Sequence, residues 1–444
     1  MKRYDSYKDS GVEWIGEVPS HWEVLSLLYT LRGKIIDGPH ETPNYVEEGI
    51  PFISIDSIND TKDIDLSVVK KYISELDYKV YSKKTKIDFG DVLFTKAATI
   101  GKTAIVGNEK FMVWSPLAIL KPNKEMLNNQ FLYYLLNIKR AITAVILSGS
   151  FSTQINVGMR EMEKLKIMLP SVREQESIVF YLNSKCGEID KVISTQEKRI
   201  ALLQELKQSI ITHAVTKGLN PDVKMKDSGI DWIGEVPSHW DTIPLKYSSQ
   251  GGKKSFIDGD WIESNVITTD GIRYLTTGNV GVINYKEQGT GFISEKTFHD
   301  LNCTEVFPGD ILISRLNLPI GRACIVPDLG YRIVVAVDNV IYRPNKTFLN
   351  KYYAIYQMNC KPYSENASFI ARGSTMQRIS RSMLGSIHLL LPPITEQQEI
   401  ASYLDKRCAQ IDASISKAQK EIELLQEYKQ SLITEVVTGK RKVC

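Results

Sequence analysis

Two short patterns in this sequence could carry out chemistry if the fold placed them correctly. Residues 100–103, Ile-Gly-Lys-Thr, are similar to the end of a phosphate-binding loop, but Lys96 stands where that loop needs a glycine, and strand-like residues follow. The nuclease-like pattern Glu-x-Lys begins at Glu205 and again at Glu427. No strand supplies a partner carboxylate for either copy of Glu-x-Lys, and both copies lie in segments with helical spacing. We therefore predict neither a nucleotide-binding loop nor a nuclease centre.

Other catalytic arrangements are also missing from the sequence. It has no glycine-rich loop suited to a methyl-donor cofactor, no Asn-Pro-Pro-aromatic motif and no nucleophile with a recognisable base. The six cysteines form no Cys-x-x-Cys pair and no metal-type spacing with histidine, which favours a reducing cytoplasm. No apolar run approaches the roughly 18 residues of a membrane span. The net charge of +3 permits a nucleic-acid partner without arguing for one. We expect no cofactor and no metal on this chain.

The chain is organised around a stretch that occurs twice. Residues 9–22 read DSGVEWIGEVPSHW and residues 227–240 read DSGIDWIGEVPSHW. A second pair, LPSVREQESIVFYL at 169–182 and LPPITEQQEIASYL at 391–404, follows at almost the same offset. Identity this long indicates an internal duplication, and 444 residues are too many for one core. We predict two half-chains in tandem, in which the two opening motifs pack equivalent corners and neither His21 nor His239 is a ligand.

The two middle segments share a pattern of strands but few residues. Residues 90–96, Gly-Asp-Val-Leu-Phe-Thr-Lys, match residues 309–315, Gly-Asp-Ile-Leu-Ile-Ser-Arg, and residues 100–106 match residues 320–326. Each block predicts strand, loop, strand, with one cation at the end of the first strand and another just after the loop glycine. A helix is predicted over residues 129–147. A shared scaffold with divergent loops is typical of paired recognition domains with different targets.

The closing segments predict two long helices. Apolar residues recur in two columns of sevens, interleaved at four and three, which is the pattern of a coiled-coil seam. The first helix, from about residue 174 to 216, would be roughly 60 Å long at 1.5 Å per residue. Because neither helix can bury its own seam, we predict that the two pack on each other as an antiparallel coiled coil. The predicted seam comprises Leu182, Ile189, Ile193, Ile200, Leu203, Ile210, Leu404, Ile411, Ile415, Ile422, Leu425 and Leu432.

Together these features resemble a known architecture. Each repeat opens with Trp-Ile-Gly-Glu-Val-Pro-Ser-His-Trp, and the motifs Gly-Asp-Ile-Leu-Ile-Ser-Arg, Ile-Gly-Arg and Leu-Pro-Pro-Ile-Thr-Glu-Gln-Gln-Glu-Ile-Ala follow. The combination resembles the DNA-specificity subunit of a type I restriction–modification system over essentially the whole chain. The resemblance implies an α+β fold with two α/β target-recognition domains in a pseudo-two-fold tandem repeat, separated by the coiled coil. The expected boundaries are 1–22, 23–168, 169–218, 219–240, 241–390 and 391–444.

The resemblance also implies a function and partners. Each recognition domain would read one half of a bipartite site in double-stranded DNA, and the helices would set the unread gap. Two modification (methyltransferase) subunits would dock on the helices, and restriction subunits would join them. S-adenosylmethionine, ATP and Mg would belong to those partners in a prokaryotic cytoplasm, and this chain would be non-catalytic.

Candidate DNA contacts follow from the same resemblance. Arginine can read guanine through two hydrogen bonds, whereas lysine cannot. Phosphate contacts are therefore expected of Lys96 and Lys102 in the first half. The alternative, that these two lysines and the matching Arg315 and Arg322 only cap strand ends, stays open. Two polar loops precede the closing helices; their glutamines could read adenine and their arginines guanine, or they could be simple turns. The candidates are Lys96, Lys102, Ser152, Thr153, Gln154, Arg315, Arg322, Arg372, Ser374, Thr375, Gln377 and Arg378.

Two other functions are compatible with the sequence. A coiled-coil adaptor that binds two protein partners without DNA would show no salt-dependent DNA binding, whereas a DNA reader should lose affinity as salt rises. A self-contained nuclease would cleave DNA with a metal ion as a purified single chain. The missing carboxylate cluster argues against the nuclease.

Overall fold

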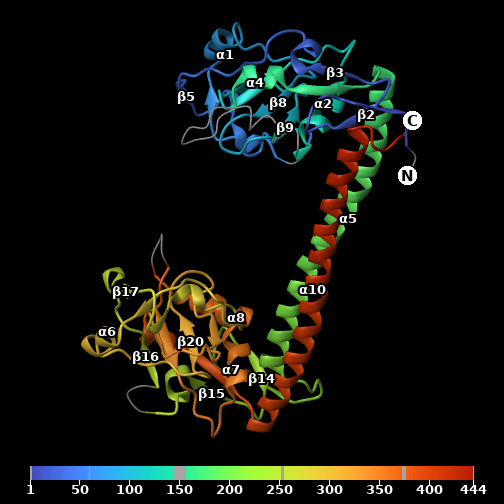
Figure 1. Cartoon of the computed structure of the whole chain (residues 1–444). Helices are drawn as coiled ribbons and strands as arrows, with labels where there is room; N and C mark the ends of the chain where they lie inside the picture. The colour runs from blue at the N-terminus through green and yellow to red at the C-terminus, as the bar shows by residue number, and fades with distance from the viewer. Residues whose placement is uncertain are drawn as a thin grey trace. The chain divides into compact units, whose positions relative to one another are not determined.

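The computed structural model describes residues 3–59, 61–139, 141, 143, 157–251, 255–372 and 377–443. The chain forms two units (Figure 1). Unit 1 comprises Met1–Gln196 and Lys420–Cys444, and unit 2 comprises Glu197–Gln419. The two long helices, α5 (Val172–Lys217) and α10 (Ile394–Val437), each contribute one part to each unit.

Each unit begins with the opening motif folded as a two-stranded hairpin. In unit 1, β1 (Tyr7–Asp9) pairs with β2 (Glu17–Pro19), and in unit 2, β13 (Met225–Asp227) pairs with β14 (Glu235–Pro237). The glycines within the turns have positive φ, which side chains disfavour. The motif ends on Trp22 and Trp240, both fully buried. The two motifs therefore occupy equivalent corners, as their sequences predict.

The opening motif is fixed to the first turn of a long helix. In unit 1 the Glu174 carboxylate accepts hydrogen bonds from the Tyr4 hydroxyl (2.7 Å) and the Trp22 indole N–H (3.1 Å) and pairs with His21 Nε2 (3.1 Å). Carboxylates near a helix N-terminus also interact favourably with the helix dipole. The His-Trp pair of the motif therefore serves to hold this glutamate.

Unit 2 repeats this junction at the start of α10. Glu396 accepts a hydrogen bond from the Trp240 indole (3.1 Å) and pairs with His239 Nε2 at 2.8 Å. The residue after each glutamate, Gln175 or Gln397, is buried and bonds backbone groups of the adjoining recognition domain. Each helix start thus joins one opening motif to one domain.

The domain of unit 1 contains two four-stranded sheets with an apolar layer between them. Residues of β8 alternate between two cores: Leu93 faces the second sheet, while Val92 and Phe94 face the helices. The first sheet is antiparallel; the second includes one parallel pair, β6 with β10. The first sheet orders β4 (Ile36–Asp37), β11 (Leu117–Leu120), β8 (Val92–Thr95) and β9 (Thr103–Ile105). The second sheet orders β10 (Met112–Val113), β6 (Ile50–Ile53), β7 (Tyr72–Ile73) and β5 (Tyr45–Val46).

Short helices and a strand pair complete this domain. The predicted helix over 129–147 is interrupted: α2 ends at Leu136, and Asn137 caps it while its amide bonds the Thr103 hydroxyl, and residues 139, 141 and 143 are again helical. Residues 144–147 of that prediction lie outside the described residues. The other elements are β3 (Glu23–Ser26) paired with β12 (Lys166–Leu169), η1 (Leu27–Thr30), η2 (Ile55–Ser57), α1 (Glu75–Tyr81), α2 (Asn129–Leu136) and α4 (Met159–Lys164).

Unit 2 has the same topology built from different residues. Its antiparallel sheet orders β16 (Phe256–Asp258), β23 (Asn339–Tyr342), β20 (Ile311–Ser314) and β21 (Ala323–Ile325). Its second sheet orders β17 (Ile267–Thr268), β19 (Phe292–Ile293), β18 (Ile272–Leu275) and β22 (Ile333–Val335), with β18 parallel to β22. The remaining elements are β15 (Asp241–Pro244) paired with β24 (His388–Leu391), η3 (Leu245–Ser248), η4 (Ser264–Val266), η5 (Thr277–Asn279), α6 (Glu295–Asp300), α7 (Lys351–Met358), α8 (Lys361–Ile370) and α9 (Arg381–Ser386).

The long helices pack antiparallel, as predicted. In unit 1 the start of α5 shares an apolar cluster with the end of α10, for example Leu182 with Leu432. In unit 2 the end of α5 packs with the start of α10, for example Ile211 with Leu404. Every residue of the predicted seam is buried or half-buried. No helix among the described residues is long and apolar enough to cross a membrane.

Candidate nucleic-acid interface

The predicted strand-end cations form buried ion pairs. Lys96 follows β8, is 8% exposed, and its ammonium lies 2.9 Å from an oxygen of Asp37 at the end of β4. Arg315 follows β20, is 5% exposed, and its Nε lies 3.0 Å from Asp258 at the end of β16. Both cations are thus neutralised inside their own domain. This placement favours the strand-capping interpretation for these two residues.

A tripeptide that occurs in both halves of the sequence marks these acidic partners, which were not among the predicted site residues. Both aspartates stand in the tripeptide Ile-Asp-Gly, at residues 36–38 and 257–259. A Cβ on Gly38 would lie 2.1 Å from the Val113 carbonyl oxygen, and one on Gly259 would lie 2.3 Å from that of Val335. Only glycine lets the two sheets approach this closely after the aspartate. The repeated tripeptide therefore marks one position in both units.

Arg322, another candidate, connects two loops through backbone carbonyls. Its guanidinium donates to Val280 O (2.7 Å) and Thr277 O (2.9 Å) on one side, and to Asn317 O (2.8 Å) and Leu316 O (3.1 Å) on the other. Burial lowers the pKa of this guanidinium. The side chain therefore organises the loops around β20 and β21.

Lys102, in the corresponding place of unit 1, is half-buried. Its backbone N–H donates to the Thr95 hydroxyl at 2.9 Å, which closes the loop that follows β8.

The second polar loop lies against the loop that begins at Arg315. Arg372 and Arg378 exchange backbone hydrogen bonds of 3.1 and 2.9 Å, and Ile379 N–H donates to the Arg315 carbonyl at 3.0 Å. Asn317 N–H donates to the Gln377 carbonyl at 3.2 Å. The structure therefore brings together two candidate groups that are about 60 residues apart in the sequence.

The side chains of this polar loop differ in exposure. Arg372 and Arg378 are exposed, and Arg378 pairs with Asp338 at 2.7 Å. The Gln377 side-chain oxygen is buried, with no hydrogen-bond partner among the described residues. The candidates Ser152, Thr153, Gln154, Ser374 and Thr375 lie outside the described residues. In unit 1, Val157 just beyond the corresponding loop donates to the Lys96 carbonyl at 2.9 Å.

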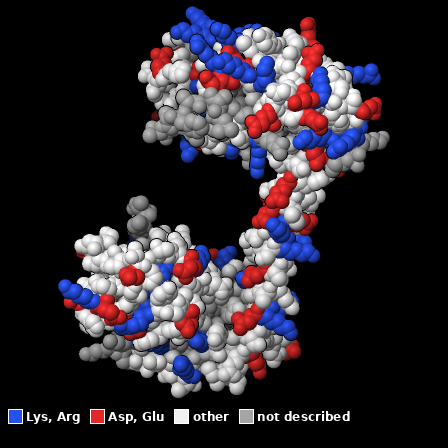
Figure 2. Space-filling view, in the orientation of Figure 1, with Lys and Arg blue, Asp and Glu red and all other residues white. Residues whose placement is uncertain are grey.

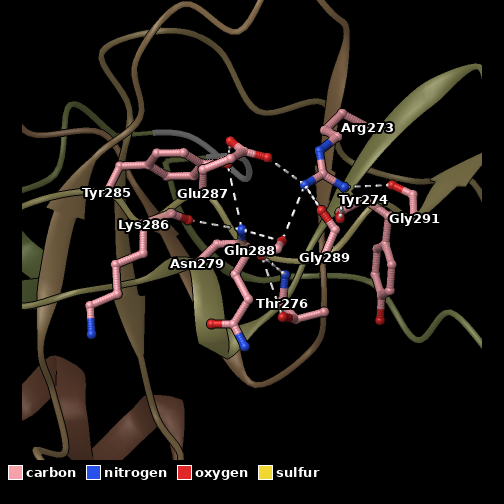
Figure 3. Close-up of polar contacts among 10 residues, drawn as sticks. All are labelled: Arg273, Tyr274, Thr276, Asn279, Tyr285, Lys286, Glu287, Gln288, Gly289 and Gly291. Atoms are coloured by element: carbon pink, nitrogen blue, oxygen red, sulfur yellow. Dashed lines mark hydrogen bonds and ion pairs between the residues drawn. The ribbon is translucent and has the colours of Figure 1, made fainter. Parts of the chain in front are cut away.

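A third loop of unit 2 lies beside the loop after Arg315 and is bonded by Arg322. None of its residues was a predicted candidate. Residues 276–291 connect β18 to β19, and Arg273 and Asn279 hold them from within (Figure 3). Arg273, only 4% exposed, donates to Gly289 O (2.6 Å) and Gly291 O (2.9 Å) and pairs with Glu287 (2.9 Å). A buried arginine between two strands has no periodic signature, so no local pattern pointed to this loop.

Asn279 completes the framework of the loop. It is 1% exposed; its amide NH₂ donates to Gln288 O (2.8 Å) and Lys286 O (3.0 Å), and its Oδ1 accepts from Thr276 N–H (2.9 Å). The hydrogen bond from Tyr285, together with Arg273, lowers the pKa of Glu287. Burial and the same glutamate raise the pKa of Tyr285 to about 12. The loop is therefore ordered by buried polar groups rather than by an apolar core.

Unit 1 has a different surface at the corresponding places. The β6–β7 connection ends in Lys70 and Lys71, and the Lys71 ammonium lies 4.6 Å from the Tyr45 ring centre and 6.0 Å from that of Trp114. These residues line a cleft of about 490 Å³. Figure 2 shows Lys and Arg gathered over the region of α1, where the exposed lysines are Lys79, Lys83, Lys84 and Lys86.

Groups of three or more metal-ligating side chains are not found among the described residues. The arrangement in each unit is an end of a sheet surrounded by polar loops and cations. Such a surface can contact phosphates and base edges.

The chain is similar to known proteins over its whole length. At 28% identity it matches a Methanocaldococcus jannaschii relative named for the type I restriction enzyme MjaX specificity subunit, covering 97% of this chain and 96% of the relative. At 24% it matches the MjaVIII specificity subunit of the same organism, covering 96% and 94%. A subunit from a solved type I restriction–modification assembly superposes with a TM-score of 0.70 at 17% identity, covering 95% of this chain and 98% of the other. The HsdS subunit of Thermoanaerobacter tengcongensis gives 0.50 at 17%, covering 96% and 98%.

The family model gives the decisive match. The model described as the type I restriction modification DNA specificity domain matches the chain twice, at residues 33–205 and 250–424. These two matches cover most of the chain and follow its duplication. The chain therefore belongs to the type I restriction–modification DNA-specificity family.

Proposed function

We propose that this chain is the DNA-specificity subunit of a type I restriction–modification complex and that each unit reads one half of a bipartite DNA site. The observation that carries the proposal is the pairing of one scaffold with two unlike surfaces. Asp37–Lys96 and Asp258–Arg315 anchor the same sheet end in both units. The loops around those anchors differ, as readers of two different sequences require. The chain is a recognition component and not itself the catalyst.

The test is the methylome of cells that express the chain with its cognate modification subunit. A two-part methylated motif with a fixed unread gap is the expected result. The absence of new methylation in cells that contain the assembled complex would contradict the proposal. Binding of the complex to its DNA site should also weaken steeply as salt rises, because Lys and Arg contacts release counterions from the phosphates. Salt-independent behaviour would favour a protein adaptor instead.

Two equivalent apolar patches on the long helices are proposed docking sites for two modification subunits. Leu202 and Leu206 are exposed on α5, and Leu424 and Tyr428 are exposed 222 residues later on α10. Spacing of four places each pair on one helix face. Two like patches created by duplication suit two copies of one partner. Changing Leu202 and Leu206 to serine should reduce the bound copies from two to one, as measured by native mass spectrometry.

Cofactor chemistry is assigned to the partners. S-adenosylmethionine is proposed to bind the modification subunits, and ATP and Mg the restriction subunits, in a prokaryotic cytoplasm. Calorimetry of the isolated chain should therefore show no S-adenosylmethionine binding. Saturable binding by the isolated chain would contradict this assignment.

A further inference from the structure

We propose that the β18–β19 connection, residues 276–291, is a base-reading element of unit 2. In this element Gln288 contacts an adenine and Lys286 contacts a neighbouring phosphate. The inference rests on the proposed function, because it names residues through which one unit would read its half-site. Neither residue was a candidate from the sequence.

The backbone of this loop is held by buried polar groups although the loop lies at the surface. Arg273 and Asn279 are buried beneath it and bond its backbone at Lys286, Gln288, Gly289 and Gly291. Base readout is favoured when the backbone that presents the reading side chains is ordered before DNA arrives, since ordering a loop on binding costs affinity. Arg273 and Asn279 hold the loop backbone in this way and leave the side chains of Lys286 and Gln288 at the surface.

The loop presents two side chains, Gln288 and Lys286, at its surface. A Cβ on Gly278 would lie 2.8 Å from Oε1 of Gln288, so the Gln288 amide lies directly over this glycine. Similarly, a Cβ on Gly281 would lie 3.1 Å from the Lys286 stem. Both residues are exposed, and Figure 3 shows the Lys286 ammonium pointing away from the network. Within the described residues neither terminal group has a hydrogen-bond or ion-pair partner, so both are available to a ligand.

The loop is continuous with the two other loops of unit 2 that carry candidate DNA contacts. Arg322 bonds Thr277 and Val280 in this loop and Leu316 and Asn317 in the next. Asn317 in turn bonds Gln377 of the polar loop. The three loops therefore form one connected surface at the Arg315 end of the antiparallel sheet.

The chemistry of the two side chains fits duplex DNA. A glutamine amide can donate a hydrogen bond to N7 of adenine and accept one from its N6 amino group, which makes a two-point contact. A lysine ammonium suits a phosphate. The connection at the corresponding place in unit 1, β6–β7, has the Lys71–Tyr45–Trp114 cluster instead. The two units therefore diverge at the element assigned to base reading, as two half-sites of different sequence require.

The test compares Gln288→Glu, Gln288→Ala and Lys286→Gln in the complex with the modification subunit. The matched control is Lys346→Gln, an exposed lysine beyond β23 at the opposite end of the same sheet. Methylome sequencing gives the motif, and fluorescence anisotropy with the wild-type cognate duplex gives the affinity at several salt concentrations. Thermal melting confirms that each variant is folded.

Gln288→Glu should weaken binding of the complex to the cognate duplex roughly 5- to 150-fold, which is the discrimination that one two-point base contact provides. The same change should shift the preferred base at one position of one half-site from adenine toward cytosine, because a carboxylate accepts a hydrogen bond from cytosine N4. Gln288→Ala should relax the same position. Lys286→Gln should lower the salt slope by about 1 without changing the motif. The control should resemble the wild type.

The outcomes separate the two proposals. A wild-type complex with a bipartite motif whose motif and affinity survive both Gln288 changes would overturn the inference alone. A wild-type complex that produces no bipartite motif would overturn the proposed function and the inference with it.

Discussion

The Tyr7 hydroxyl donates a hydrogen bond to the carbonyl oxygen of Gly439, 3.0 Å away, and so joins β1 of the first hairpin to a residue just beyond the end of α10. Both ends of the chain therefore lie together in unit 1 (Figure 1). Gly439 also lies against Trp22, since a Cβ there would be 3.2 Å from the indole, and in unit 2 a Cβ on Gly218, directly after α5, would be 3.3 Å from Trp240. The duplication thus produces two equivalent corners, and the first is assembled from opposite ends of the chain.

Gly439→Ala should destabilise unit 1. Gly439 has a φ of +73°, and a Cβ there would lie 2.4 Å from Pro19 Cδ. We expect a loss of about 1–3 kcal/mol in the free energy of unfolding, because backbone strain and a steric clash add. The control is Gly187→Ala inside α5, where a Cβ would meet nothing within 4 Å. It should gain about 0.5–1 kcal/mol from helix propensity. Denaturant unfolding measures the free energy of unfolding of both variants. Equal changes in the two variants would show that Gly439 has no special conformational or steric requirement.

Asp258→Ala should leave Arg315 buried without its nearest carboxylate. Removing one partner of a buried pair costs about 3–5 kcal/mol, and the more distant Asp338, 3.8 Å from Arg315, would recover part of it. DNA contact by unit 2 should be lost with the loop geometry. Asp300→Ala, an exposed change on α6, should stay within about 0.5 kcal/mol of the wild type. Calorimetry measures the stability of both variants, and titration with DNA measures the affinity of their complexes. An Asp258→Ala complex that binds DNA with the wild-type affinity would contradict the prediction.

Two interhelical ion pairs should contribute to the register of the coiled coil. Lys207 lies 2.7 Å from Asp412, and Lys429 lies 2.6 Å from Asp190. Because these groups are partly exposed, a double-mutant cycle on either pair should give about 0.2–1 kcal/mol. The coupling should shrink as salt rises. A coupling energy of zero at low salt would show that the apolar seam alone sets the register.

The loop 276–291 should loosen in acid. Tyr285 and Arg273 hold the pKa of Glu287 below its ordinary value of 4.5. A carboxylate with a lowered pKa stabilises the fold above its unfolded pKa, and that stabilisation is lost as pH falls through the folded value. Hydrogen exchange at residues 285–291, corrected for intrinsic rates, should therefore accelerate below about pH 4.5. Glu287→Gln should remove the pH dependence of this segment. Unchanged dependence in that variant would assign the effect to another carboxylate.

Deleting one heptad from each long helix should change the gap in the recognised site. A heptad spans about 10.5 Å of helix, which corresponds to roughly three base pairs at 3.4 Å each. The seam survives because the seven-residue repeat is kept. Methylome sequencing should show unchanged half-sites with a shorter gap. Altered half-sites with an unchanged gap would contradict the division between reading and spacing.

Local patterns in the sequence were sufficient for the framework. The repeated motif showed the duplication, the sevenfold spacing of residues such as Leu182 and Leu404 predicted the coiled coil, and the blocks ending in Lys96 and Arg315 predicted strand, loop, strand. These signals are readable because periodicity and repetition act between residues close in the chain or between two copies of one segment.

Only the tertiary structure decided which residues meet. Lys96 pairs with Asp37, Trp22 donates to Glu174, and Arg273 reaches the carbonyl of Gly289. The partners in these pairs lie tens to more than a hundred residues apart, or on a loop without periodicity, so their pairing follows from sheet register and packing. For the same physical reason Lys96, Arg315 and Arg322 became anchors inside their domains, and the exposed groups over Gly278 and Gly281 emerged from the fold alone.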